Sequence, residues 1–495
     1  MAFLLYLAAL WTLILFTRSL LRRYARLPYP PGPRPRFLIG NLLDMPAHLP
    51  WLTYTEWGKQ YGDIIHTQIF NQHFIILNSA KIAVDLLEKR ASIYSDRPVI
   101  PMISLMGWDF NLGLIPYGDK WRQYRRVFHQ YFRRKSVPVY HPIQLRKVHN
   151  LLRGLVSTPQ DFYAHTKTYA AAIIMAAVYG YDIQPVHDRF VDLSEDAVQR
   201  LGDATAPGVF LLNSFPFLRH MPSWLPGCGF HLFAQETREI LAEMQNATFD
   251  LVRDNMRDGL EKNSILGDIL GQIDASGGSS AQEKVAKEVA ATSYAADTTS
   301  STLNSFFLAM AMNPGVQRKA QAEIDAAIGF DRLPTFEDRS RMPYVEAIYR
   351  ELMRWSSALP LGVLHASTED DVYDGYYIPK GTAVFTNIWA MGRDESVYHD
   401  ADKFIPERFI NSDDQLDNND TILGFGFGRR ICVGRHFAEA VVWLTVASVL
   451  SAFDIQKAKD SEGNDIDLHP VYLDGMVSPI PMLNRTALRS REKTC

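Results

Sequence analysis

Residues 425–434, Phe-Gly-Phe-Gly-Arg-Arg-Ile-Cys-Val-Gly, constrain the fold of this chain more than any other stretch. Their glycines permit backbone conformations closed to other residues and let the chain approach a flat ligand closely. A cysteine thiolate is a soft, strongly donating ligand, and neighbouring arginines favour its ionised form. Residues 435–450 are apolar at helical spacing, so Cys432 stands just before a helix N-terminus, where partial positive charge also suits a thiolate. The segment predicts a metal-binding cysteine.

This segment resembles the ligand loop of the cytochrome P450 family, whose pattern is Phe-x-x-Gly-x-Arg-x-Cys-x-Gly. Phe425, Gly428, Arg430, Cys432 and Gly434 match it at every specified position. A lone cysteine is usually a small buried hydrophobe, but a match over this whole segment is highly specific. The resemblance implies haem b as cofactor, Cys432 as axial ligand of the iron and Arg430 as a partner of a haem propionate. In the family the thiolate favours cleavage of the oxygen–oxygen bond.

A second resemblance lies in two segments that carry one carboxylate and two guanidinium groups. Glu351-Leu-Met-Arg354 places an acid and a base at i, i+3 on one helix face, which alone would indicate a surface ion pair of little energetic value. Pro406-Glu-Arg-Phe409 supplies Arg408, which resembles the third member of the family's Glu-Arg-Arg network. That network implies a role in holding the fold, not in catalysis.

Two further segments resemble positions at which the family holds a haem propionate, and they stand in the family's order along the chain. Trp121-Arg-Gln-Tyr-Arg125 resembles the Trp-x-x-x-Arg pattern of the family's third helix, in which the indole and the guanidinium hold a haem propionate. The alternative is an amphipathic helix face. By the same resemblance His365 occupies the position of a propionate-contacting residue, although a lone histidine is more often structural.

The segment Tyr294-Ala-Ala-Asp-Thr-Thr299 lies within residues 285–312, which contain no Gly or Pro and predict one helix about 42 Å long. Threonine hydroxyls compete for backbone carbonyls in mid-helix, and such a breach of local preference often marks function. The segment resembles the family's Ala-Gly-x-Asp-Thr-Thr motif, which implies Asp297 as the acid and Thr298 as the alcohol of a proton relay. Tyr294 and Ala295 depart from the motif, where Ala and Gly are usual.

The N-terminus predicts a membrane anchor. Residues 2–17 carry no charge, and Arg18, Arg22, Arg23 and Arg26 follow them, whereas a cleaved signal peptide has its positive charge first. The positive-inside rule then keeps the rest of the chain cytosolic, as expected for a single-pass protein of the endoplasmic reticulum membrane. We expect an anchor over residues 1–21, a basic, proline-rich linker over 22–36 and a haem domain over 37–495.

The remaining pattern predicts a mainly α fold with a minor β-sheet, as the resemblance to the P450 family also implies. Residues 63–78 indicate two short strands, 81–155 are mostly helical, 342–356 indicate another helix, and 375–387 indicate further strands. The irregular, unusually apolar stretch 207–229 is ordinary core, an access channel or a second membrane contact. Three cysteines do not describe a disulfide framework.

Charge gives a separate indication of partners. The net charge of −4 gives no sign of nucleic-acid binding. Residues 120–135 carry seven Lys and Arg and no acid, which fits either a solvated helix face or a docking patch for an acidic flavoprotein. No fused reductase is recognisable, so the resemblance implies electrons from NADPH through a separate NADPH–cytochrome P450 reductase.

These features predict a monooxygenase that inserts one oxygen atom into a C–H or C=C bond of a lipophilic small molecule. Tyr294, Ala295, Val363 and Met476 are the candidate substrate-facing residues, by position alone. Residues 50–54, 95–98 and 370–376 resemble fungal members of secondary metabolism, which act on terpenoids, polyketides and indole amines among others. Two alternatives stay open: a haem-thiolate isomerase or dehydratase that needs no reductase, and a haem-binding sensor without turnover.

Overall fold

The computed structural model describes residues 27–184, 187–205, 211–260, 263–294, 296–413, 415–417, 422–468, 470, 472, 474 and 486–491. The expected anchor over residues 1–21, residues 22–26 of the linker, and the candidate residues Ala295 and Met476 lie outside these ranges. Within them, no helix has the length and apolar character needed to cross a membrane.

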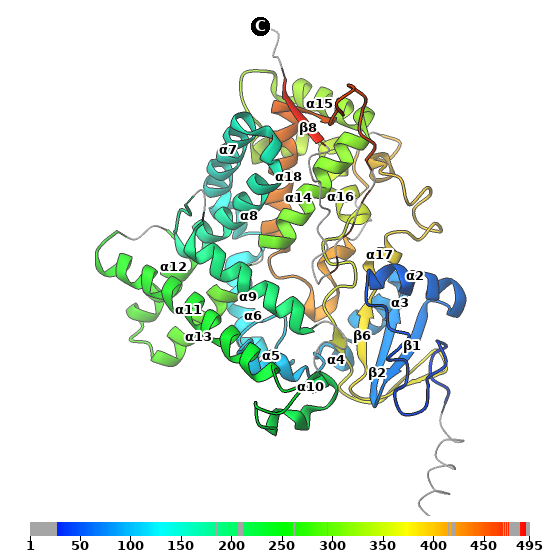
Figure 1. Cartoon of the computed structure of the whole chain (residues 1–495). Coiled ribbons are helices and arrows are strands. Elements are labelled where there is room, and N and C mark those ends of the chain that lie inside the picture. Colours follow the sequence, from blue (N-terminus) through cyan, green and yellow to red (C-terminus); the bar gives the residue numbers. More distant parts are fainter. Residues whose placement is uncertain are drawn as a thin grey trace, which may run out of the picture.

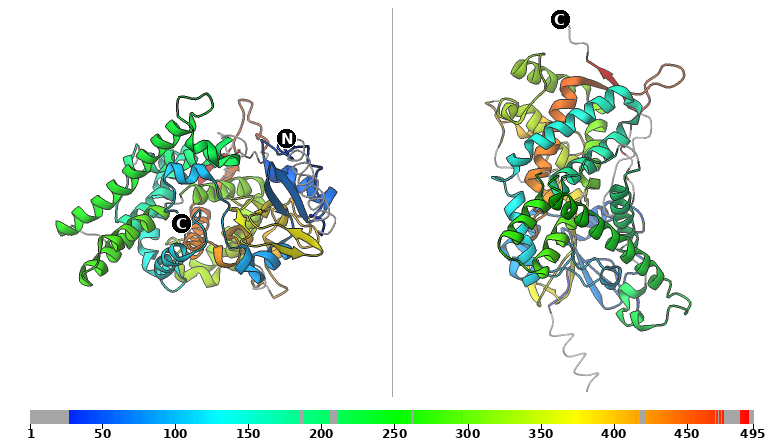
Figure 2. Two further views of the ribbon diagram at one scale, coloured as in Figure 1. Left: turned by 90° about the horizontal axis from the view of Figure 1, so that it is seen from below. Right: turned by 90° about the vertical axis from the view of Figure 1, so that its left-hand side faces the viewer.

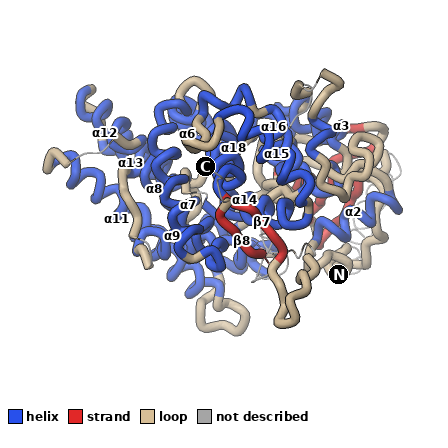
Figure 3. The backbone as a smooth tube through the Cα atoms, turned by 90° about the horizontal axis from the view of Figure 1, so that it is seen from above, coloured by secondary structure: helices blue, strands red, loops and turns tan. Residues whose placement is uncertain are grey.

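Helices make up most of the described chain, as Figure 3 shows, in agreement with the predicted mainly α class. In the N-terminal half they are α2 (Pro50–Tyr61), α3 (Ala80–Val84), η1 (Asp85–Lys89), α4 (Ala91–Tyr94), α5 (Pro101–Met106), α6 (Asp119–Phe132), η2 (Val137–Tyr140), α7 (His141–Ser157), η3 (Pro159–Asp161), α8 (Phe162–Tyr179), α9 (Arg189–Thr205), α10 (Leu211–Ser214) and η4 (Pro216–His220). In the C-terminal half they are α11 (Phe230–Arg257), α12 (Ile265–Ala275), α13 (Ser280–Thr292), α14 (Ala296–Met312), α15 (Pro314–Ile328), η5 (Phe336–Arg341), α16 (Pro343–Trp355), α17 (Ile388–Met391), η6 (Pro406–Phe409), η7 (Leu423–Phe425), η8 (Gly428–Arg430) and α18 (Arg435–Ala452).

Three small sheets complete the fold. The largest has the strand order β1-β2-β6-β3, formed by β1 (Ile64–Ile69), β2 (Gln72–Leu77), β6 (Ala383–Thr386) and β3 (His365–Ala366). The other two pair β4 (Asp371–Tyr373) with β5 (Tyr376–Ile378), and β7 (Phe453–Lys457) with β8 (Thr486–Ser490). The hairpin and the strands predicted from residues 63–78 and 375–387 are therefore confirmed. Figures 1 and 2 show the largest sheet beside the helical bulk of the molecule.

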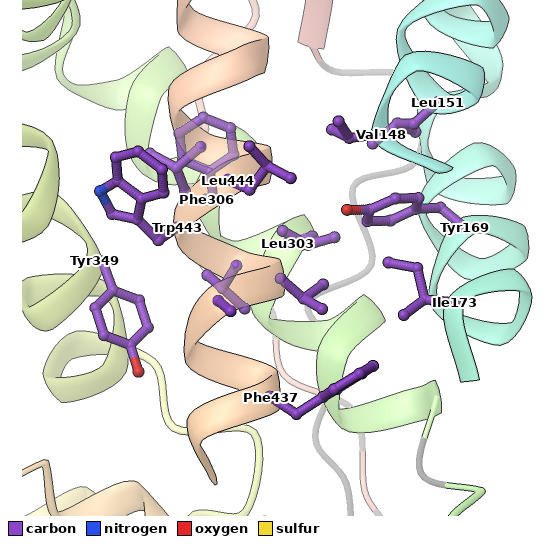
Figure 4. Packing of buried hydrophobic residues seen from close by; sticks show 14 of the residues in the cluster. Val148, Leu151, Tyr169, Ile173, Leu303, Phe306, Tyr349, Phe437, Trp443 and Leu444 are labelled. Atoms are coloured by element: carbon purple, nitrogen blue, oxygen red, sulfur yellow. The ribbon is translucent and has the colours of Figure 1, made fainter. Parts of the chain in front are cut away.

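The main hydrophobic core surrounds α18. This helix is buried continuously from Ala440 to Ser451, as expected for a helix that is apolar on all sides. Helices α7, α14, α15 and α16 pack against it, and the Tyr169 hydroxyl of α8 bonds to the Thr445 hydroxyl at 2.8 Å. Figure 4 shows side chains from several helices meeting here, among them Val148, Leu151, Tyr169, Ile173, Leu303, Phe306, Tyr349, Trp443 and Leu444.

The predicted continuous helix over residues 285–312 is wrong. The structure has two helices, and Ser293 and Tyr294 lie between the end of α13 at Thr292 and the start of α14 at Ala296. The Thr292 and Ser293 hydroxyls donate to the carbonyls of Glu288 and Val289, at 2.8 and 3.2 Å. The N–H groups of Ser293 and Tyr294 turn to carbonyls three residues back. Side-chain hydroxyls that compete for backbone carbonyls weaken a helix. Here the competing hydroxyls are those of Thr292 and Ser293, which precede the pair Thr298 and Thr299.

The predicted network of Glu351, Arg354 and Arg408 is confirmed. Arg354 donates Nε and Nη2 to the two oxygens of Glu351, both at 2.7 Å, and Arg408 Nε lies 3.3 Å from Glu351 Oε1. The Glu351 side chain is fully buried. Arg354 also donates to the carbonyls of Gly392 and Ala401, so the network fastens α16 to the chain before η6.

Candidate functional site

One cavity of about 410 Å³ opens between α6, α8, the junction of α13 and α14, and the segment before α18. Its volume lies in the range of small-molecule sites, about 300–1,000 Å³. Of the residues singled out from the sequence, it is lined by Trp121, Arg125, Tyr294, Thr298, Val363, His365, Arg430 and Cys432. The structure thus brings together residues that are more than 300 positions apart in the chain.

The Cys432 loop is a close-fitting piece of backbone. Gly428 has a φ of +55°, and a Cβ there would lie 2.1 Å from the Leu87 carbonyl oxygen, so a side chain is excluded. The Cys432 N–H donates to the Phe425 carbonyl at 2.8 Å, which closes the loop directly before α18. The Cys432 side chain is accessible from the cavity. The expected position of Cys432 just before a helix is confirmed.

Without a bound metal, the surroundings of Cys432 favour the protonated thiol. Burial raises the pKa of its thiol, whereas the Gly434 N–H and the charges of Arg125 and Arg435 act in the opposite direction. A metal cation bound at the sulfur would reverse this balance, because a coordinating thiol is deprotonated.

Three arginines and one histidine line the same cavity: Arg97, Arg125, Arg430 and His365. Arg125 Nη1 donates to the Ile431 carbonyl at 2.7 Å. Arg430 is held by the carbonyls of Ser95, Leu112 and Ile115, at 2.7, 3.2 and 2.8 Å. His365 Nδ1 contacts the Tyr94 carbonyl at 2.8 Å, and since a carbonyl only accepts, Nδ1 is the donor.

Arg97 is a residue that the sequence analysis missed. It is buried, and it donates to the carbonyls of Gly113, Val363 and Leu364 at 2.7, 3.0 and 2.5 Å. In the sequence, residues 95–98 contributed only to the resemblance to fungal members of the family. A single arginine before a proline does not by itself predict a binding site. Only the fold, which packs this extended segment against residues 363–365, reveals its place at the cavity.

The guanidinium groups of Arg97, Arg125 and Arg430, called the cation cluster below, favour an anionic ligand. Within the described ranges no ion pair joins Arg97, Arg125 or Arg430 to a carboxylate, and the nearby Asp96 Oδ1 accepts the N–H groups of Arg97 and Tyr117. Burial, followed by repulsion from Arg430, holds the pKa of Arg97 well below its usual range. Burial likewise lowers the pKa of Arg430 to about 10 and that of His365 to about 3. Buried charge of this kind is costly until it is paired.

The predicted acid and alcohol face different surroundings. Thr298, Thr299 and Thr302 line the cavity, whereas Asp297 is absent from its described wall. Burial raises the pKa of Asp297, and Lys167 of α8 opposes this effect. Adjacent residues of one helix point in different directions, so the acid lies behind the alcohol as seen from the cavity.

Two of the four candidate substrate-facing residues can be placed at the cavity. Tyr294 and Val363 line the cavity, and Ala295 and Met476 lie outside the described residues. The ring of Tyr294 packs against Ala170 and Ala171 of α8. Its hydroxyl is buried and has no hydrogen-bond partner among the described atoms.

The fold is mainly helical, and it presents one cysteine and several cations to the same cavity. These features are those of a class of proteins that bind an anionic metal cofactor through a thiolate. The family model "Cytochrome P450" matches residues 30–482, and the chain belongs to this family. Family membership implies a haem, whose two propionates suit the cation cluster and whose iron suits Cys432. The resemblance proposed from the motifs is therefore confirmed.

Fungal proteins are among the similar sequences. Cytochrome P450 monooxygenase COX1 of Coprinopsis cinerea is 41% identical over 483 residues, which cover 94% of this chain and 92% of the relative. Cytochrome P450 monooxygenase 208 of Postia placenta is 40% identical, with coverages of 95% and 92%. Cytochrome P450 monooxygenase ple1 of Rhodocybe pseudopiperita is 38% identical, with coverages of 94% and 90%. The prediction of an enzyme of the P450 monooxygenase class is confirmed at this level.

Proposed function

We propose that this chain inserts one oxygen atom of O2 into an uncharged, lipophilic small molecule. The observation that carries the proposal is that one cavity is lined by Cys432, by the three arginines Arg97, Arg125 and Arg430, and by Thr298. A thiolate ligand, anchors for a cofactor and groups that can transfer protons are thereby available to one bound substrate.

Cys432 would hold the iron of haem b. Arg97, Arg125, His365 and Arg430, with Trp121 beneath two of these guanidinium groups, would hold the propionates. When bound, the haem supplies the binding and reductive splitting of dioxygen, and the protein orients the substrate and excludes competing water.

Thr298 and Asp297 would manage the protons that this chemistry consumes. Burial raises the pKa of Asp297 and so favours the protonated carboxyl, which can donate a proton. The Thr298 hydroxyl, which lines the cavity, can give up its own proton there and take one from the acid side.

The cavity wall favours an uncharged substrate. Ala170, Ile173, Ile174, Leu359 and Val363 contribute apolar surface. The hydroxyl donors of Thr292 and Ser293 are already engaged by backbone carbonyls. Terpenoids, polyketides and indole-derived compounds of fungal secondary metabolism have the required apolar character, which the similarity to fungal enzymes supports.

Electrons would come from NADPH through a separate reductase that docks on α6. Lys120, Arg122, Arg126 and Arg133 are exposed on or just after this helix, together with Arg134 and Lys135. Trp121 and Arg125, on the opposite flank of the same helix, reach the cavity. A basic surface this close to the cofactor site suits an acidic flavoprotein, attracted by charge.

We further propose that the protein lies on the endoplasmic reticulum membrane. Phe37 and Leu38 are 90% and 75% exposed, and Phe217 and Trp224 are 59% and 78% exposed. The two groups adjoin, because the ring of Phe70, at the tip of the β1–β2 hairpin, lies 4.6 Å from that of Phe215. Figure 1 shows this hairpin and α10 at one end of the molecule. An exposed apolar surface beside an uncharged N-terminal segment fits a lipid bilayer.

Reconstitution tests the proposed reaction. Purified protein, an NADPH–cytochrome P450 reductase and ¹⁸O2 are incubated with a panel of terpenoid, polyketide and indole compounds. We expect products with one ¹⁸O atom, and about 100-fold slower product formation in Thr298→Ala than in the wild type or Thr299→Ala. Reductase-independent conversion to an isomer or a dehydrated product would instead favour the isomerase or dehydratase. Haem binding without turnover across the panel would favour the sensor.

A further inference from the structure

Two aromatic side chains that can be oxidised connect the cavity with the surface of the protein. Trp121 of α6 lines the cavity and is buried. Tyr117 precedes α6 and is partly exposed. The centroids of the two rings lie 5.0 Å apart, and the ring planes are tilted by 43°. A single ring-to-ring contact therefore leads from the wall of the cofactor cavity to solvent.

The other tyrosines of the described cavity wall offer no such connection. Tyr294 and Tyr349 also line the cavity. Both hydroxyls are buried, and neither has a hydrogen-bond partner in the described part of the chain. A tyrosine that loses an electron must also release its hydroxyl proton, and these two hydroxyls have no described acceptor for it. Trp121, with the partly exposed Tyr117 beside it, is the better outlet.

Two guanidinium groups lie close to the ring of Tyr117. The Cζ atoms of Arg122 and Arg429 are 5.5 and 5.3 Å from its centroid. Arg429 Nη1 also donates to the Tyr117 hydroxyl oxygen at 3.1 Å, so this contact leaves the hydroxyl proton available to solvent water. Because nearby cations oppose positive charge on the ring, oxidation of Tyr117 must be accompanied by loss of that proton.

We propose that Trp121 and Tyr117 form an outlet for oxidising equivalents, which protects the cofactor site when no substrate is bound. The proposal rests on the proposed haem in this cavity. A peroxide oxidises the haem-loaded site and is itself reduced to water. Trp121 gives one electron to the oxidised site and takes one from Tyr117, so the indole is restored. Tyr117 releases its hydroxyl proton to water, and the neutral tyrosyl radical takes a hydrogen atom from a thiol in solution.

Three variants separate this route from a structural role of the two rings. Tyr117→Phe keeps a ring beside Trp121 and removes the hydroxyl that can be oxidised. Trp121→Phe keeps a ring at the cavity wall and removes the indole that relays the electron. Tyr181→Phe is the matched control, because Tyr181 is a partly exposed tyrosine whose hydroxyl donates to Asp188, remote in sequence from α6.

The experiment uses the haem-loaded, full-length protein without substrate or reductase. Hydrogen peroxide is added with a nitrone spin trap, and mass spectrometry of peptides locates the trapped radical, counted per bound haem. We expect an adduct on Tyr117 in the wild type and in Tyr181→Phe, and its loss in Trp121→Phe. A wild type without this adduct, or an adduct that persists undiminished in Trp121→Phe, overturns the route.

The rate at which peroxide bleaches the Soret band tests the protective role. Tyr117→Phe should bleach faster than the wild type and Tyr181→Phe, because oxidising equivalents stay at the cofactor site. Equal rates in all three proteins overturn protection. Incorporation of ¹⁸O into product is a separate measurement: a Tyr117 adduct in a protein that oxygenates no substrate supports the outlet and contradicts only the proposed reaction.

Discussion

Arg430 lies over the indole of Trp121, with its guanidinium carbon 4.8 Å from the ring centroid. Arg125, one helical turn beyond Trp121, approaches the same ring at 5.8 Å. The indole therefore supports two cations at the edge of the cavity, and such contacts with a desolvated ring are worth about 2 kcal/mol. Through Arg430 and Ile431 the arrangement also connects α6 to the Cys432 loop.

Removing this support should release haem faster. We expect Arg125→Gln to accelerate haem loss about 10- to 100-fold, because a hydrogen bond to a charged group contributes about 1.5–3 kcal/mol. Arg126→Gln, which changes the adjacent exposed residue of α6, is the control. Transfer of haem to an excess of a haem-scavenging protein gives the rates, and equal rates for both variants would contradict a propionate contact at Arg125.

The Glu351 network should dominate the stability of the region around α16. Glu351→Gln leaves Arg354 and Arg408 without their buried anion, so the free energy of unfolding should fall by about 3–5 kcal/mol. Glu56→Gln breaks an exposed pair with Lys59 and should cost less than about 1 kcal/mol. Urea unfolding measures both, and a similar small loss in the two variants would show that the buried network is energetically neutral.

Haem binding should be coupled to protonation of His365. Burial and the Arg97 charge hold the pKa of His365 at about 3 without an anion, so the ring is neutral at pH 7. A propionate beside it raises this pKa, so the bound state takes up a proton and haem affinity rises as the pH falls through the raised pKa. The slope is at most about one logarithmic unit per pH unit.

Haem affinity measured from pH 8 down to the lowest pH at which the protein stays folded tests this coupling. His365→Gln should remove the His365 component of the slope, whereas His129→Gln, on the exposed side of α6, should retain it. A slope identical in the wild type and His365→Gln would contradict proton uptake at this ring.

The exposed aromatic surface should contribute to membrane affinity. In a chain that begins at residue 27, Phe217→Ser with Trp224→Ser should weaken binding to phospholipid vesicles at least tenfold, because burial of an aromatic side chain contributes about 1.5–3 kcal/mol. Val397→Ser, at another exposed apolar residue, is the control. Vesicle sedimentation gives the affinities, and equal binding by all three proteins would exclude a lipid contact at this surface.

Motifs with fixed spacing predicted much of the site. The glycine and arginine positions around Cys432, the pair Glu351 and Arg354, and the pair Trp121 and Arg125 each lie within a few residues, so one sequence is sufficient to find them. Hydrophobic periodicity likewise predicted the β1–β2 hairpin and α18. These signals are local in the sequence, so reading them does not require knowledge of which distant segments pack together.

Other features depend on tertiary contacts that no local pattern contains. Arg97 joins the cavity because an extended segment packs against residues 363–365. The absence of Gly and Pro concealed the break between α13 and α14, at which the hydroxyls of Thr292 and Ser293 bond to carbonyls.

The carbon monoxide difference spectrum of the reduced protein tests the central claim, that Cys432 is the thiolate ligand of a haem. The account predicts a strongly red-shifted Soret band in the wild type and its loss in Cys432→His, while Cys228→Ser, at a buried cysteine, keeps it. A folded, haem-loaded wild type with an unshifted band, or a shifted band that survives in Cys432→His, would contradict the account.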